Sequence, residues 1–204
     1  AENDILKARI VELESALWSA LRLRGLGEAY HEPMTLYGDR KKYRARMDEI
    51  EAQIREALAM KPDVRLAHFN LAVLAEKRND PAAAQAAYLK ELELHPNNFK
   101  AAFNLGKLYE ALRRPAEQEA AFRQAIAINP EFGEGYFYLA KLLLDQGQRY
   151  EEAVTLAKKG LEVAPRSPYA PLGHYVLADL YSRLGRHAQA AAEARRGASL
   201  EKKK

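Results

Sequence analysis

Apolar and polar residues alternate along residues 65–204 with the spacing of paired α-helices. In the first pair the largely apolar stripes are His68, Leu71, Ala72 and Ala75, then Ala84, Tyr88 and Leu92. Steps of three and four residues place such side chains on one face of a helix. The polar segment KRND separates the stripes, and Asp80 before Pro81 is typical of the start of a second helix. The pattern therefore predicts a helix–turn–helix unit.

This unit recurs along the chain with a nearly constant period. Pro62, Pro96, Pro130 and Pro165 are spaced by 34, 34 and 35 residues. The phrase FNLA at residues 69–72 returns 34 residues later as FNLG at residues 103–106. Such a period indicates a repeat protein, in which each unit buries its apolar face against its neighbours.

The four units resemble tetratricopeptide repeats (TPRs). The TPR pattern has a large residue, Leu-Gly and Tyr in the first helix, Ala and an aromatic residue in the second, and then Pro. The second unit carries it at Leu105, Gly106, Tyr109, Phe122, Ala125 and Pro130. The resemblance implies an all-α fold, a right-handed α-solenoid of antiparallel helix pairs, with repeats at 65–98, 99–132, 133–167 and 171–204. A helix often ends with a residue in the left-handed conformation, which Asn79, Gly147 and Gly185 suit and Arg113, at the equivalent place, does not.

Residues 1–61 are less regular but also helical in pattern. Two further stripes are Leu6, Ile10, Leu13, Leu17 and Leu21, then Tyr43, Met47, Ile50, Ile54 and Ala57. Terminal repeats are expected to diverge, because one of their faces meets no further repeat. We therefore expect residues 1–61 to form an N-terminal helical hairpin that caps the array.

Composition and charge narrow the classes of function. The chain has no cysteine, which excludes disulfides and cysteine-bound metals, and it has no apolar run long enough to span a membrane. The net charge of +4 is mild and favours acidic partners without requiring nucleic acid. The basic run at residues 40–46 has Asp39, Asp48 and Glu49 close by, so we interpret it as a solvated helix start. Because the chain begins at Ala1 and ends in EKKK, we expect a fragment or a processed chain, and the compartment, cytoplasmic or periplasmic, stays open.

The sequence offers no arrangement suited to catalysis. None of the five histidines has the HExxH spacing of a metal site, and no serine stands in a GxSxG context. The segment GLGEAY at residues 25–30 lacks the preceding strand and the third glycine of a dinucleotide site. We therefore expect no enzyme, no metal and no cofactor.

The TPR resemblance instead directs attention to the first helices, which in that family line a concave groove. Their fifth position is aromatic in all four repeats, two asparagines follow it, and lysines lie on the same side. The candidate peptide-binding residues are Phe69, Phe103, Phe137, Tyr175, Asn70, Asn104, Lys100, Lys107 and Lys141. We expect a protein or peptide partner that is acidic and partly apolar. An alternative is that the fifth-position aromatics pack against the neighbouring repeat.

Two other functions remain open from the sequence. The segment PLGHYVLADLYSRLGR at residues 171–186 resembles TPR tails of bacterial sulfatase-like proteins, so the chain would then belong to a larger multidomain enzyme. The last predicted helix, AQAAAEARRGASLEKKK, has a small alanine face that no further helix covers. Self-association of the chain through this last helix is the second alternative.

Overall fold

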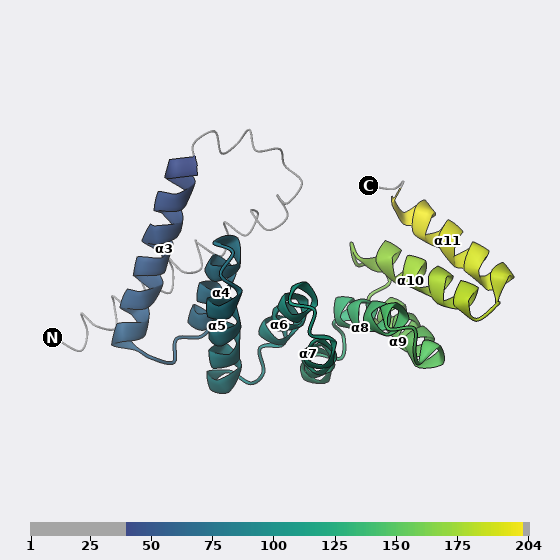
Figure 1. Ribbon diagram of the computed structural model, residues 1–204, viewed down its shortest axis with the longest axis horizontal. Helices are drawn as coiled ribbons and strands as arrows, with labels where there is room; N and C mark the ends of the chain where they lie inside the picture. Colours follow the sequence, from purple (N-terminus) through teal and green to yellow (C-terminus); the bar gives the residue numbers. More distant parts are fainter. Residues whose placement is uncertain (1–39, 202–204) are drawn as a thin grey trace. The chain divides into compact units, whose positions relative to one another are not determined.

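The computed structural model describes residues 40–201, and within this range it contains nine α-helices and no strand (Figure 1). The helices are α3 (Arg40–Met60), α4 (Ala67–Lys77), α5 (Pro81–Leu94), α6 (Phe99–Ala111), α7 (Pro115–Ile128), α8 (Gly133–Asp145), α9 (Tyr150–Val163), α10 (Ala170–Arg183) and α11 (His187–Glu201). This confirms the predicted all-α class. The stripe at Leu6–Leu21, and with it the first half of the predicted hairpin, lies outside the described residues. No helix within residues 40–201 has both the length and the apolar character that a membrane crossing requires.

The chain divides into two compact units, and the first comprises residues 1–95. In it α3 packs against α4, and α4 pairs with α5. The core between α3 and α4 contains Met47, Ile54, Ala57, Val64, Ala67 and Leu74. Arg78, directly after α4, forms ion pairs with Asp48 and Glu51 of α3. Residues 47, 54 and 57 were predicted to share one face of a helix, and that face is buried here.

Unit 1 also contains a buried carboxylate that the sequence analysis missed. Glu91 on α5 is 0% exposed and accepts hydrogen bonds from the backbone N–H groups of Leu66, at 3.1 Å, and Phe69, at 3.2 Å. These donors belong to the first turn of α4, where helical N–H groups have no partner within the helix. Leu66 itself has a φ of 68°, in the left-handed region. Glu91 therefore caps α4 from the neighbouring helix.

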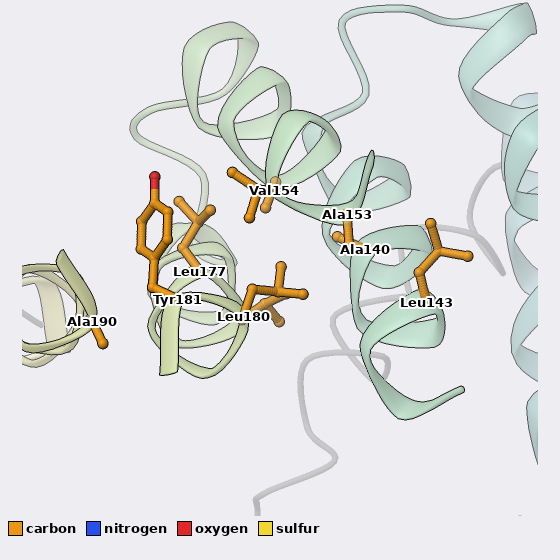
Figure 2. Close-up of a cluster of buried hydrophobic side chains, with 10 residues drawn as sticks. Ala140, Leu143, Ala153, Val154, Leu177, Leu180, Tyr181 and Ala190 are labelled. Carbon is orange, nitrogen blue, oxygen red and sulfur yellow. The ribbon is translucent and has the colours of Figure 1, made fainter. Parts of the chain in front are cut away.

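The second unit comprises residues 96–204 and contains three helix pairs, α6 with α7, α8 with α9, and α10 with α11. Successive pairs also contact each other, α8 with α7, and α10 with both α8 and α9. In Figure 2 Val154 of α9 points toward Leu177 of α10, and Ala153 of α9 lies beside Ala140 of α8. The small side chains on α9 thus let two first helices pack against it, which is the stacking that a repeat array requires.

The turns inside the pairs follow the predicted chemistry at most positions. Asp80 accepts a hydrogen bond from the N–H of Ala83 at 3.0 Å, and Pro81 is the first residue of α5. Asn79, Gly147 and Gly185 have φ values of 58°, 69° and 73°. Arg113 was expected not to adopt this conformation, yet its φ is 56°. The reason is the turn itself, because the N–H of Arg114 bonds to the carbonyl of Tyr109, at 2.9 Å, and fixes the backbone between them.

Candidate functional site

The candidate site in unit 2 is the set of side chains on α6, α8 and α10 that the packing leaves uncovered. We call this set the first-helix face. It comprises Lys100, Phe103, Asn104 and Lys107 on α6, Glu134, Tyr138 and Lys141 on α8, and Leu172, Tyr175 and Asp179 on α10. Steps of three or four residues place each group on one side of its helix. On α6 the intervening residues Ala101, Ala102, Leu105 and Leu108 are buried, so packing fixes which side of that helix is uncovered.

Two of the four fifth-position aromatics are core residues. Phe69 is 1% exposed and packs edge-on against Tyr88, and Phe137 is 0% exposed. A Cβ at Gly160 of α9 or at Gly173 of α10 would lie 2.5 Å from the Phe137 ring. Phe137 is therefore held between two glycines, one on each neighbouring helix. Phe69 and Phe137 are thus both buried against neighbouring helices, as the packing alternative describes.

Phe103 and Tyr175 are partly exposed and also have structural contacts. The Phe103 ring lies 5.1 Å from that of Tyr138, 4.9 Å from Phe132 and 5.5 Å from Phe122. The Tyr175 hydroxyl donates to Glu201 at 2.9 Å, and this hydrogen bond raises the pKa of Tyr175. Both residues leave part of their ring on the first-helix face.

The two asparagines differ in setting. Asn70 lies in unit 1, and its Nδ2 atom is buried without a hydrogen-bond partner among the side chains and backbone groups that the structure describes. Asn104 lies in unit 2 and is partly exposed on α6. Tyr138 and Val176 take the corresponding position in the later repeats. Of the two, only Asn104 has its side chain at the uncovered face of unit 2.

The three lysines also separate into two kinds. Lys100 and Lys107 are exposed on α6, and Lys100 Nζ lies 5.9 Å from the centre of the Phe99 ring. Lys141 on α8 is half-buried between Glu110, at 3.1 Å, and Asp145, at 2.9 Å. Burial alone would lower the pKa of Lys141, but the hydrogen bonds to Asp145 and Glu110 outweigh it and raise that pKa. Lys141 is thus charged, and Glu110 and Asp145 already compensate its charge. Lys100 and Lys107, in contrast, have no ion pair within the described range.

The structure adds aromatic and acidic residues that the sequence analysis did not group. Tyr138 is partly buried, and burial, followed by the nearby Tyr169, Glu110 and Glu134, raises its pKa. Tyr169 precedes α10 and is 47% exposed. Ser167 connects this segment before α10 to α8, since its hydroxyl donates to Glu134 of α8 at 3.0 Å. In the sequence, Tyr138 was noticed only because it replaces the asparagine found at the same repeat position in the first two repeats. Its role was missed because its spatial neighbours lie about 30 residues away in either direction along the chain.

Two other predicted features concern metals and the last helix. No group of three or more His, Cys, Asp or Glu side chains in residues 40–201 is arranged to hold a metal ion. On α11, Ala191 is exposed at the position where α9 has the buried Val154. Self-association through α11 stays a prediction.

Comparison with known proteins agrees with the repeat pattern. Models described as tetratricopeptide repeat match residues 74–131, 121–155 and 173–204, which together cover more than half of the chain. The chain belongs to the tetratricopeptide repeat family. The recognition made from Leu105, Gly106 and their equivalents is therefore confirmed.

Solved TPR structures resemble this one in fold. A crystal structure of MamA has a TM-score of 0.68 at 18% identity, over 81% of this chain and 95% of MamA. YrrB, described as a TPR protein with an unusual peptide-binding site, has a TM-score of 0.62 at 14% identity, over 88% of this chain and 91% of YrrB. At these identities the likeness concerns the fold.

Two curated relatives each match one stretch of the TPR chain. The protein O-mannosyl-transferase TMTC3 of Homo sapiens and that of Mus musculus are each 41% identical to it over 54 residues. The match covers 26% of this chain, and the chain spans about 6% of the length of these relatives.

Proposed function

We propose that this TPR chain binds a peptide or protein segment along the first-helix face of unit 2. The observation that carries the proposal is the uncovered group Lys100, Phe103, Asn104 and Lys107 on α6, beside helices whose other faces are packed. It joins an aromatic edge, an amide and two cations on one side of one helix. These are the groups that hold an extended, acidic backbone. The peptide-binding site attributed to YrrB supports the same class of function for this fold.

The burial of the aromatics limits which residues take part. Phe69 and Phe137 are excluded from the binding surface, and Lys141 contributes less than Lys100 and Lys107 because Glu110 and Asp145 already compensate it. Phe103 contributes an edge, and its remaining surface packs against Phe122. We therefore place the acidic part of the partner over α6. The expected partner is still acidic, but Lys100 and Lys107, rather than all three lysines, bind its acidic residues.

The test uses a phage library of random dodecapeptides selected on the whole chain. We expect enriched peptides to carry Asp or Glu, because Lys100 and Lys107 are the cations available on this face. The double variant Lys100→Glu, Lys107→Glu should weaken the best peptide about 5- to 30-fold in fluorescence polarisation. Lys159→Glu, which reverses an exposed charge on α9, is the matched control and should leave the affinity unchanged. Equal binding to the double variant and the wild type would refute the proposal.

A further inference from the structure

The first-helix face changes character between α6 and α8. Glu134 and Tyr138 are four residues apart on α8, so they lie one turn apart on the same side of that helix. The Ser167 hydroxyl donates to Glu134 at 3.0 Å and accepts the backbone N–H of Tyr169 at 3.1 Å. Ser167 thereby fixes the start of the Tyr169 segment beside the Glu134 carboxylate. Two tyrosines and one carboxylate meet where α8 faces the turn before α10.

This place carries an excess of negative charge. Glu110 and Asp145 share the single cation Lys141. Glu134 is bound by the neutral Ser167, and no ion pair to it exists in the part of the chain that the structure describes. Glu110 and Glu134 are thus the two carboxylates near Tyr138, and Lys141, which Asp145 also binds, is the one ammonium group beside them. Asp179 on α10 adds a further exposed carboxylate to the same face.

The aromatic groups are also available to a ligand. Tyr169 is 47% exposed, one of two large hydrophobic side chains exposed to about this degree among the side chains that the structure describes. It stacks on no other ring among these described side chains. Tyr138 packs one side against Phe103, with ring centres 5.1 Å apart, and stays partly exposed. A cation over exposed aromatic rings, with a carboxylate nearby, is attracted by both the rings and the charge.

We infer that Glu134, Tyr138 and Tyr169 bind the side chain of a lysine or arginine in the same segment that Lys100 and Lys107 bind through its acidic residues. The inference rests on the proposed function and adds a second, oppositely charged subsite to it. Lys100 and Lys107 on α6 face an anion, and the carboxylates around Tyr138 face a cation, so the partner segment has acidic and basic residues in a fixed order. A partner that is acidic throughout would meet Glu134 and Asp179 and be repelled there.

The experiment starts from the dodecapeptides selected on the whole chain. We expect Lys or Arg to be enriched at a constant distance from the acidic residue. Replacing that Lys by norleucine, or that Arg by citrulline, removes the charge and keeps most of the stem. This replacement should weaken binding to the wild type about 3- to 10-fold.

Three variants localise the effect. Glu134→Gln keeps an acceptor for Ser167, and Tyr169→Ala removes an exposed ring, so circular dichroism should show both folded. The norleucine or citrulline penalty should disappear in Glu134→Gln and shrink in Tyr169→Ala. Glu162→Gln, on the exposed side of α9, is the matched control and should keep the full penalty.

The outcomes separate this inference from the proposed function. If acidic peptides depend on Lys100 and Lys107 but no basic residue is enriched, the cation subsite is refuted and the proposed function stands. A penalty that is unchanged in Glu134→Gln also refutes the subsite. If no selected peptide depends on Lys100 or Lys107, both the proposed function and the cation subsite are refuted.

Discussion

At the scale of single residues, Phe137 shows how an aromatic position that recurs in every repeat takes a structural role. Its ring occupies the space that Gly160 and Gly173 leave, on two different helices. Tyr175 lies against Gly197 in the same way, with a distance of 3.0 Å from a Cβ built there. Gly106 similarly makes room for the Phe122 ring of its partner helix, as the TPR pattern implied. For Phe137 and Phe122, which are both 0% exposed, the glycine opposite the ring leaves the space in which the ring is buried.

This packing gives a prediction for Gly160→Ala. In an exposed helix the substitution would stabilise the protein by about 1 kcal/mol. Here the new methyl group would lie 2.5 Å from the Phe137 ring, so we expect a loss of about 1–3 kcal/mol in the free energy of unfolding. Urea unfolding followed by circular dichroism measures it. Adding Phe137→Leu to Gly160→Ala should recover part of the loss, because the ring that clashes is gone. A stabilised Gly160→Ala protein would contradict the close contact.

At the scale of elements, ion pairs connect neighbouring helix pairs in unit 2. Arg149, before α9, donates to both carboxylate oxygens of Glu119 on α7, at 2.8 Å and 2.6 Å. Arg123 binds Glu119 as well, at 2.9 Å. Arg186, before α11, pairs in the same way with Glu151 on α9, at 2.6 Å. Arg149 and Arg186 thus each stand directly before a second helix and contact the second helix of the preceding pair.

We therefore expect Glu119 to make stability depend on pH. The hydrogen bonds from Arg149, and then those from Arg123, lower the pKa of Glu119 from 4.5 to about 2. A carboxylate with a lowered pKa stabilises the fold above its unfolded pKa, and this contribution is lost as the pH falls from about 4.5 to about 2. Since Arg149 is 40% exposed, solvent screening limits the contribution to about 1 kcal/mol.

Glu119→Gln tests this dependence. The variant should lose about 1 kcal/mol at pH 7, and the gap to the wild type should close as the pH approaches 2. Thermal unfolding at several pH values measures the gap, and raising the salt concentration should narrow it at pH 7. Glu162→Gln, whose carboxylate pairs with Lys159 on its own helix, is the control. A gap that stays constant down to pH 2 would assign the loss to packing.

The sequence predicted the helices well because their signals are local. Stripes such as Ile54 and Ala57, and the Asp80–Pro81 start, lie within one helix or turn. Arg113 was misjudged because the hydrogen bonds around a turn select its backbone conformation, whatever side chain it carries. The burial of Phe137 depends on Gly160 and Gly173, at 23 and 36 residues' distance, so no pattern within α8 reveals it. The Tyr138 neighbourhood, assembled from three elements, was inaccessible for the same reason.

At the scale of the whole molecule, unit 2 has a hydrophobic core made entirely of its own described residues. In unit 2 the main cluster draws on α8, α9, α10 and α11, and a second joins Phe122 of α7 to Leu139 and Leu142 of α8. The unit also begins with its own cap, since Asn98 accepts a hydrogen bond from the N–H of Ala101 at 3.2 Å. All of these contacts lie within residues 96–204.

We therefore expect a fragment of residues 96–204 to fold by itself. Three helix pairs are about the smallest number that sustains a repeat array, because each pair needs a neighbour to cover its apolar face. The fragment should give a helical circular dichroism spectrum and a cooperative thermal transition. Residues 133–204 would lose the contact of α8 with α7 and leave Leu139 and Leu142 uncovered, so this shorter fragment should melt at a lower temperature. A 96–204 fragment that is unfolded at 25 °C would mean that unit 1 supplies stability that the core of unit 2 lacks.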